Sequence, residues 1–324
     1  MTRADQDDEL AQALDVAPTA APESPPAHSP LRVASRSGLL LAALGAIAFS
    51  GKAIIVKLGY RYGADAVTLL ALRMLVAFPV FALMGAWAAR RAAPLATADR
   101  WRIVLLGFLG YYLASFLDFA GLAYITATLE RLILYLTPTL VALIGLLAFR
   151  RRITRRQLVA LLVSYVGVAL AFGHDLQLGG GNIALGSALV FGSALAYALY
   201  LVGSGELVNR VGAVRLTAYA SSVASVLCLL QFALLRPLDA LVLPAEVYAL
   251  SLLNGTVCTV LPVLAVMMAV ARIGSSLASQ VGMIGPVSTI VLSMLLLDEP
   301  MGPWQVAGTV LVMAGVFVVS RQKP

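Results

Sequence analysis

The stretch TATLERLILYLTPTLVALIGLLAF, from Thr126 to Phe149, is apolar and long enough to cross a bilayer, and it carries Pro138 in its middle. A second stretch, SSLASQVGMIGPVSTIVLSMLLL from Ser275 to Leu297, carries Pro286 in the same place. A proline removes one backbone hydrogen bond and clashes with the carbonyl four residues earlier, so each stretch is expected to kink or break. In hydrocarbon, such a defect requires protein or water to satisfy the freed groups. Interrupted segments at matching places in two halves of a chain are typical of a transporter's binding site.

The composition indicates a polytopic membrane protein. Of the 324 residues, 60% are hydrophobic and 12% are charged, and the mean hydropathy is +0.92. Soluble domains carry about 25% charged residues, so this chain has too little polar surface to face water. The net charge of +7 would suit nucleic acid, but membrane proteins gather basic residues in cytoplasmic loops. We therefore expect no nucleic-acid partner. Cys228 and Cys258 lie in apolar stretches and only two histidines occur, so we expect no disulfide and no metal site.

We predict an all-α polytopic membrane protein with ten transmembrane helices. The predicted spans lie near residues 37–58, 65–88, 102–123, 126–149, 155–173, 183–205, 214–235, 246–271, 275–297 and 303–320. Residues 1–36 are rich in acidic residues and then in Pro, Ala and Ser, which predicts a disordered tail. The expected domains are this tail, a first five-span repeat at 37–173, a second at 183–320 and a short C-terminus at 321–324.

The distribution of basic residues predicts that both termini are cytoplasmic. With the N-terminus inside, the cytoplasmic segments hold seventeen basic residues: Arg3, Arg32, Arg36, Arg90, Arg91, Arg100, Arg102, Arg150, Arg151, Arg152, Arg155, Arg156, Arg210, Arg215, Arg272, Arg321 and Lys323. The outer loops hold three, namely Lys57, Arg61 and Arg236. Cytoplasmic loops carry the excess of Lys and Arg in membrane proteins, and one missed span would scramble this alternation.

The chain repeats itself at a distance of 148 residues. Six matched positions are Ala123, Ile125, Leu129, Pro138, Gln157 and Gly167, which fall on Ala271, Ile273, Leu277, Pro286, Gln305 and Gly315. Each unit holds five predicted spans. Because five is odd, the second unit crosses the membrane upside down relative to the first. This inverted repeat is the architecture of many secondary transporters.

Five charged residues lie inside predicted spans and more than two residues from their ends: Lys52, Arg73, Asp118, Glu130 and Arg131. Each costs roughly 2.5–3.5 kcal/mol at a span's centre, so they should face the protein interior and pair. At about 1.5 Å per residue, all five lie in the outer half of the membrane. They indicate a polar outer vestibule with one net positive charge, suited to a carboxylate or a zwitterion. Alternatively, Arg73–Asp118 and Lys52–Glu130 are structural pairs that hold the spans together.

Helical periodicity adds further candidates on the polar faces of the spans. Tyr111 and Ser115 share a face with Asp118, Tyr197 and Tyr200 share one with two serines, and Ser279 shares one with Pro286. The predicted cavity residues are Lys52, Arg73, Tyr111, Ser115, Asp118, Glu130, Arg131, Tyr197, Tyr200 and Ser279, with Pro138 and Pro286 as hinges. Plain helix packing is the alternative for the faces of the sixth and ninth spans. The mid-span tyrosines need hydroxyl partners.

No motif of an enzyme occurs. Gly51-Lys52 lies in a span, and Ala53 stands where a phosphate loop needs Ser or Thr. The sequence contains no H-E-x-x-H and no G-x-S-x-G. We therefore expect that the protein is not an enzyme.

The chain resembles the EamA-type branch of the drug/metabolite transporter (DMT) superfamily over roughly residues 38–320. The resemblance is carried by Arg73 in LLALRMLVAF, by Pro138 and Pro286, and by Asp298-Glu299-Pro300 with Gln305 and Gly315. Two departures concern the first half. Arg151 stands at the position equivalent to Glu299, where the family often has an acid in both repeats. Glu130-Arg131 stands where the second repeat has Ala278 and Ser279.

The resemblance implies a carrier for amino acids or related metabolites in the bacterial inner membrane, often an exporter, working by alternating access around a central cavity. We expect a small-molecule substrate and the lipid bilayer as partners, and a homodimer is left open. No cofactor is expected, although Glu130 or Asp118 could couple transport to protons. The alternatives are a multidrug or organic-cation efflux carrier and, ranked below it, a non-transporting membrane scaffold or a membrane-embedded enzyme.

Overall fold

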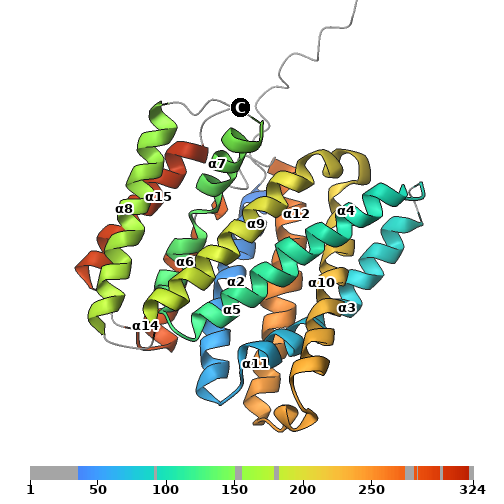
Figure 1. The fold of residues 1–324 in the computed structure, drawn as a ribbon, viewed down its shortest axis with the longest axis horizontal. Coiled ribbons are helices and arrows are strands. Elements are labelled where there is room, and N and C mark those ends of the chain that lie inside the picture. The colour runs from blue at the N-terminus through green and yellow to red at the C-terminus, as the bar shows by residue number, and fades with distance from the viewer. Residues whose placement is uncertain are drawn as a thin grey trace, which may run out of the picture.

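The computed structural model describes residues 36–90, 93–149, 155–178, 182–273, 281–282, 284–299 and 302–320. All regular elements within these ranges are helices, as Figure 1 shows. A helix satisfies its own backbone hydrogen bonds, which is what an apolar segment surrounded by lipid requires. The prediction of an all-α fold is confirmed.

Where the structure describes it, each predicted span corresponds to one helix or to two or three consecutive ones. The first half contains α2 (Arg36–Arg61), α3 (Ala66–Ala89), α4 (Thr97–Gly107), the π-helical η1 (Phe108–Leu113), α5 (Ala114–Leu122), α6 (Ala127–Leu134), α7 (Thr137–Phe149) and α8 (Arg155–Leu178). The second half contains α9 (Ile183–Val211), α10 (Ala213–Leu235), the 3₁₀-helical η2 (Leu238–Leu241), α11 (Ala245–Gly255), the π-helical η3 (Thr256–Val260), α12 (Leu261–Ile273), α14 (Ile284–Leu296) and α15 (Pro303–Ser320).

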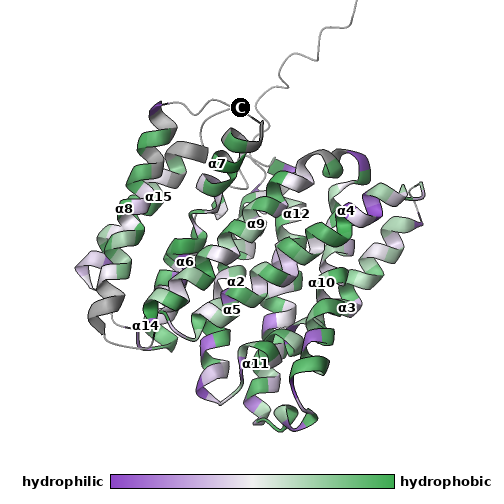
Figure 2. Ribbon diagram, viewed as in Figure 1, coloured by the Kyte–Doolittle hydropathy of each residue, from purple (hydrophilic) through white to green (hydrophobic). Residues whose placement is uncertain are grey.

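The helices have the length and surface of membrane spans. Among the described residues, seven stretches are long and apolar enough to cross a membrane, and shorter apolar helices occur at 162–173 and 287–296. The hydrophobic colour runs along much of the helical ribbon in Figure 2, and Leu83, Leu147 and Leu234 are 71–75% exposed. Apolar surface on this scale suits a lipid environment. The protein is therefore a multi-pass membrane protein, and the count of ten spans stays a prediction.

The two halves pack against each other in a pattern that repeats. Helix α2 of the first span packs against α12 of the eighth, and α5 of the third packs against α9 of the sixth. The first and sixth spans are counterparts in the two repeats, and so are the third and eighth. The repeat therefore converts the first of these contacts into the second. The pairs α3 with α10 and α8 with α15 each map onto themselves under the same repeat. This is the packing of two like units about a pseudo-two-fold axis.

A π-helical turn at the same place in each half is a second sign of the repeat. The segments η1 and η3 begin at Phe108 and Thr256, 148 residues apart. Each follows a glycine that a neighbouring helix approaches closely. A Cβ on Gly107 would lie 2.7 Å from the carbonyl oxygen of Ala220, and one on Gly255 would lie 2.9 Å from that of Arg73. Turns of this kind are frequent at functional sites.

The fourth span is interrupted just before its proline. Helix α6 ends at Leu134 and α7 begins at Thr137, so Pro138 is the second residue of α7, where a missing N–H is tolerated. The proline leaves the Leu134 carbonyl without its usual helical donor. The Thr137 hydroxyl donates to this carbonyl instead, at 2.6 Å. Pro286 is likewise the third residue of α14. Pro138 therefore begins a helix rather than kinking its middle, whereas residues 281 and 282, shortly before Pro286, are also helical.

Candidate functional site

A buried charged cluster joins α2, α5 and α6. The Lys52 ammonium donates a hydrogen bond to Asp118 Oδ2 and lies 3.5 Å from Glu130 Oε1. The side chains of Lys52, Asp118 and Glu130 are 7%, 2% and 0% exposed. One cation thus bridges two carboxylates from different helices. The predicted Lys52–Glu130 contact is present, whereas Asp118 pairs with Lys52 rather than with Arg73.

Glu130 is the least satisfied member of this cluster. Thr126 caps α6 by accepting a hydrogen bond from the Leu129 amide at 3.1 Å, which places Glu130 in the first turn, where the helix dipole favours an anion. Neither carboxylate oxygen has a hydrogen-bond partner within the described part of the chain. Its charge is met by Lys52 and by Arg131, whose Nε lies 3.8 Å from Oε2. The Glu130 carboxylate can therefore accept a hydrogen bond from a ligand.

Arg131 connects the cluster to the second half of the molecule. Its Nε donates to Thr289 Oγ1 of α14 at 3.0 Å. A second link between α6 and α14 joins the hydroxyls of Thr128 and Ser293 at 3.2 Å. Thr289 is outside the predicted set, although it continues the face of Pro286 and Ser293 at helical spacing, and that periodicity is the signal for it.

Phe49 borders the two cations of the cluster. Its ring centroid lies 5.4 Å from Lys52 Nζ and 5.5 Å from Arg131 Cζ, within the range of cation–π attraction. Phe49 is 41% exposed while both cations are buried. It therefore lies between the cluster and the surface. Phe49 is also outside the predicted set, and its position three residues before Lys52 on one helix is the available signal.

Arg73 is buried separately, between α3 and the second half. Its Nε donates to Thr259 Oγ1 in η3 at 2.8 Å, and its Cζ lies 5.3 Å from the Phe119 ring centroid. Its Nη1 has no hydrogen-bond partner among the described residues. Arg73 is therefore a buried cation beside the π-helical turn, with no carboxylate paired to it in the part of the chain that the structure describes. Thr259 is a further residue that the sequence prediction does not include.

The predicted tyrosines gather in a second, uncharged cluster. The hydroxyls of Tyr111 in η1 and Tyr200 in α9 share a hydrogen bond at 3.2 Å, with the rings edge to face at 5.1 Å. Tyr197 stacks on Tyr200 at 5.6 Å and is 37% exposed. Ser115 is only partly buried, on α5 between η1 and Asp118. Hydroxyls of Tyr111 and Tyr200 thus find partners in each other.

The predicted outer vestibule is closed in this structure. The five charged side chains are at most 6% exposed as whole residues, because the helices close around them, and four of the five ions lie against an opposite charge. Of the remaining predicted residues, Ser279 lies outside the described residues, and so does the side-chain environment of Pro286. No group of three or more His, Cys, Asp or Glu within the described ranges is placed to hold a metal ion.

Glu299 links the two halves at the predicted outer end. Both of its carboxylate oxygens accept from the Ala127 amide at 3.1 Å, and Lys57 Nζ lies 3.4 Å from Oε1. Lys57 also donates to the Ile125 carbonyl at 2.6 Å. Glu299, which carries part of the family resemblance, therefore ties the end of α14 to the beginning of α6.

The apolar helices, the paired packing of two halves and the ions buried between them define a multi-pass helical membrane protein with a polar centre. Both halves match the EamA-like transporter family, at residues 36–173 and 184–321, and the chain belongs to that family. This assignment agrees with the DMT superfamily suggested by the motifs.

Relatives of the chain carry transporter names. It is 31% identical over 297 residues to "Uncharacterized transporter YcbK" of Bacillus subtilis (strain 168), covering 87% of this chain and 91% of that protein. It is 24% identical over 287 residues to an "Uncharacterized transporter" of Archaeoglobus fulgidus, covering 88% and 97%. A solved structure described as "Crystal structure of protein" has the same fold, with a TM-score of 0.60, 17% identity, and 88% and 98% coverage. The family and these relatives support a membrane transporter and favour it over an enzyme.

Proposed function

We propose that this protein is a secondary transporter that exports small metabolites such as amino acids across the bacterial inner membrane by alternating access, with both termini in the cytoplasm. The family supports the coarser part of this statement, which is transport of a small molecule across a lipid bilayer. The cluster of Lys52, Asp118, Glu130 and Arg131 is the single observation that carries the finer part.

The charge balance of the cluster suits a zwitterionic substrate. Two cations face two carboxylates, so the cluster as a whole is neutral. An amino acid brings one charge of each sign and can replace internal contacts without changing this balance. Its ammonium group would bind Glu130, whose oxygens lack hydrogen-bond donors among the described residues. Its carboxylate would bind Arg131 or Lys52. Buried charges in membrane proteins mark substrate and ion pathways.

The position of Arg131 supports coupling between binding and movement. Its hydrogen bond to Thr289 connects α6 of one half to α14 of the other. A substrate carboxylate that takes the guanidinium away from Thr289 would weaken this contact. A ligand shifts a conformational equilibrium only through contacts that differ between the two states, and this contact is a candidate.

Proton coupling belongs to the same proposal. Asp118 and Glu130 share one ammonium group, and Asp118 holds the shorter contact. A proton on Glu130 would remove a buried charge that no hydrogen bond satisfies among the described residues. It would weaken the ionic contacts with Lys52 and Arg131, but Lys52 keeps its hydrogen bond to Asp118 and Arg131 keeps its hydrogen bond to Thr289. We therefore assign the coupling proton to Glu130 ahead of Asp118.

Organic-cation efflux is the second candidate, and Glu130 with Phe49 favours it. A carboxylate with free acceptor positions beside an exposed aromatic ring can bind an organic cation through charge and cation–π attraction. Such a substrate would require Glu130 but not Arg131. The two candidates therefore predict different responses to removal of the arginine.

The test is transport in proteoliposomes loaded with amino acids or with quaternary ammonium compounds, with and without a pH gradient. We expect Glu130→Gln to abolish gradient-driven amino acid efflux and Arg131→Gln to weaken it at least tenfold. Arg236→Gln, which alters an exposed pair, is the matched control and should transport normally. Efflux of cations alone, unaffected by Arg131→Gln, would favour the second candidate. Unchanged efflux of amino acids in Glu130→Gln would refute the proposed role of the cluster.

A further inference from the structure

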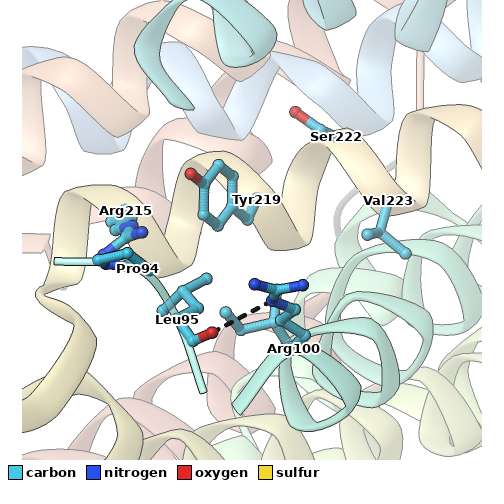
Figure 3. Close-up of a pocket in the computed structure, with 8 residues that line it drawn as sticks. Pro94, Leu95, Arg100, Arg215, Tyr219, Ser222 and Val223 are labelled. Atoms are coloured by element: carbon cyan, nitrogen blue, oxygen red, sulfur yellow. Dashed lines mark hydrogen bonds between the residues drawn. The ribbon is translucent and has the colours of Figure 1, made fainter. Parts of the chain in front are cut away.

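A pocket of 490 Å³ opens at the end of the bundle that the arginine count predicts to be cytoplasmic. Its lining includes Leu95, Arg100, Ile103, Arg215, Tyr219 and Val223, from α4, the segment before it and α10. Figure 3 shows Arg215 and Tyr219 on α10 facing Leu95 and Arg100. The pocket shares no residue with the charged cluster or with the tyrosine cluster.

The two arginines of the pocket are positioned but not neutralised. Arg215 is 8% exposed, and its Nη1 donates to the Ala93 carbonyl at 2.9 Å. Its Nε is buried and has no hydrogen-bond partner among the described residues. Arg100 Nε donates to the Leu95 carbonyl at 3.2 Å. Backbone carbonyls orient both guanidinium groups without cancelling their charge.

The nearby carboxylate is already occupied. Asp99 Oδ1 pairs with Arg210 Nη2 at 2.7 Å, and no ion pair to Arg100 or Arg215 occurs within the described ranges. Arg215 also lies over Tyr219, with its Cζ 5.6 Å from the ring centroid. The pocket therefore presents two cations on an aromatic and aliphatic wall. An anion is the chemical complement of this arrangement, and planar guanidinium groups suit the oxygens of a phosphate.

An apolar stripe on α10 continues from the pocket toward the other end of the bundle. Arg215, Tyr219 and Val223 recur at helical spacing and lead to Val226, Leu230 and Leu234. The last three are 51%, 52% and 74% exposed. Exposed apolar residues on a spanning helix face lipid tails. A ligand with its charged group at the arginines could thus lay a hydrocarbon chain along this stripe.

The equivalent place in the other half carries no such site. At a distance of 148 residues, Arg100 corresponds to Tyr248. Around Arg215 the distance is 149 residues, as between the positive-φ glycines Gly63 and Gly212, so Arg215 corresponds to Ala66. There, Ala240 and Leu241 of η2 pack against Val67, Ala71 and Phe232. Apolar side chains therefore occupy this region, and the repeated fold does not require the arginines.

We propose that the pocket binds the phosphate headgroup of an anionic membrane lipid, such as phosphatidylglycerol, with an acyl chain along the exposed face of α10. Basic pockets between spanning helices on the cytoplasmic side recognise anionic headgroups in this way. The site lies apart from the substrate cluster and takes a different ligand. The bound lipid would hold the beginning of α4 against α10, where the segment before α4 contacts Arg215.

The experiment is native mass spectrometry of the full-length protein in detergent, with phosphatidylglycerol and phosphatidylcholine of identical acyl chains in competition. Wild type is expected to retain phosphatidylglycerol preferentially. Arg215→Gln and Arg100→Gln should each lower that preference about fivefold. Arg102→Gln, an exposed arginine of the same helix outside the pocket lining, is the matched control and should behave as wild type. Glycerol phosphate and inorganic phosphate are added in separate arms.

Three outcomes would overturn the proposal. The first is equal retention of the two lipids by wild type. The second is an equal loss of preference in Arg102→Gln, which would indicate general surface charge. The third is displacement of the lipid by millimolar inorganic phosphate, which would assign the pocket to a soluble anion. If Arg215→Gln does not fold, the lipid preference of Arg100→Gln tests the proposal. Arg100 is exposed, so its replacement should leave the fold intact.

Discussion

Lys52, at the centre of the charged cluster, and Tyr200, in the tyrosine cluster, occupy equivalent positions in the two repeats. Lys52 and Tyr200 are 148 residues apart, and so are Tyr111 and Thr259. In the first half the residue at this position bridges two carboxylates. In the second half it shares one hydroxyl hydrogen bond. The repeated backbone therefore places two side chains alike while their chemistry differs.

The difference lies in what each cluster needs in order to be buried. Burying an ion costs several kcal/mol unless partners compensate it, whereas a buried hydroxyl needs only one hydrogen bond. The charged cluster is stable only as a set, so a single removal should damage it severely. The tyrosine cluster can lose a hydroxyl and keep its aromatic packing. The predictions below test this contrast, from the largest expected effect to the smallest.

Replacement of the central cation should have the largest effect. Lys52→Met leaves Asp118 and Glu130 buried near each other with Arg131 as the remaining cation, and loss of one partner of a buried pair costs about 3–5 kcal/mol. Thermal unfolding of the purified variant in detergent measures the loss. The double variant Lys52→Met with Asp118→Asn should recover part of it. A melting temperature equal to that of wild type would show that the cluster does not depend on its cation.

Gly110 provides the next largest test, because it is where the tyrosine cluster meets η1. A Cβ on Gly110 would lie 2.3 Å from Tyr200 Cγ and 2.6 Å from its Cβ. Gly110→Ala should therefore displace Tyr200 and destabilise the protein by about 1–3 kcal/mol. Gly205→Ala on α9, where nothing lies within 4 Å, is the control and should not destabilise. Equal melting temperatures for the two variants would show that η1 and Tyr200 accommodate the added methyl group without loss of stability.

Loss of the tyrosine hydroxyls should have a modest effect. Tyr200→Phe and Tyr111→Phe each remove one side of the same hydrogen bond, so each should cost about 1 kcal/mol or less. Thr217 also hydrogen-bonds to both hydroxyls, so the double variant should cost less than the sum of the single losses only by the hydrogen bond that the two tyrosines share. A double-mutant cycle on thermal or denaturant unfolding measures this coupling. Strictly additive losses would show that the hydroxyls act through separate partners.

The exposed pair of Asp65 and Arg236 should show the smallest effect, and it depends on pH. Burial opposes ionisation of Asp65, but hydrogen bonds from Thr68 and Val67 and the Arg236 charge hold the pKa of this carboxyl below its ordinary value. Its contribution to stability is therefore present above the ordinary pKa of about 3.9 and is lost as the pH falls through the lowered pKa. Solvent screens this half-exposed group, so the contribution is small.

Melting temperatures measured between about pH 6 and pH 3 test this sign. Wild type should lose stability toward the acidic end, and Asp65→Asn should lose less. Arg236→Gln should fall between the two, because the hydrogen bonds from Thr68 and Val67 remain. A steeper acid loss in Asp65→Asn than in wild type would contradict the lowered pKa.

Much of the candidate site follows from the sequence, and the rest fails for identifiable reasons. Lys52, Asp118, Glu130 and Arg131 are expensive in a span, so their inward orientation and mutual contact could be predicted. The choice of Lys52 rather than Arg73 as the partner of Asp118 could not, because it depends on how far α2, α3 and α5 are rotated toward one another. Thr259 and Thr289 were missed for a related reason. Burying a threonine in an apolar span costs little free energy, so the sequence does not mark it. Only the position of a neighbouring helix shows that it accepts a hydrogen bond.

The sequence by itself determined that this is a membrane protein of two related halves with the charges deepest in its spans in the first, because these features depend on apolar length, period and residue type. It also located an interruption near Pro138, which the structure places at the beginning of α7. The tertiary structure alone decided which ions pair, that Phe49 borders them and that Arg215 keeps an unmet donor in an open pocket. Those outcomes depend on distances between helices that are remote in the chain, and close packing sets these distances.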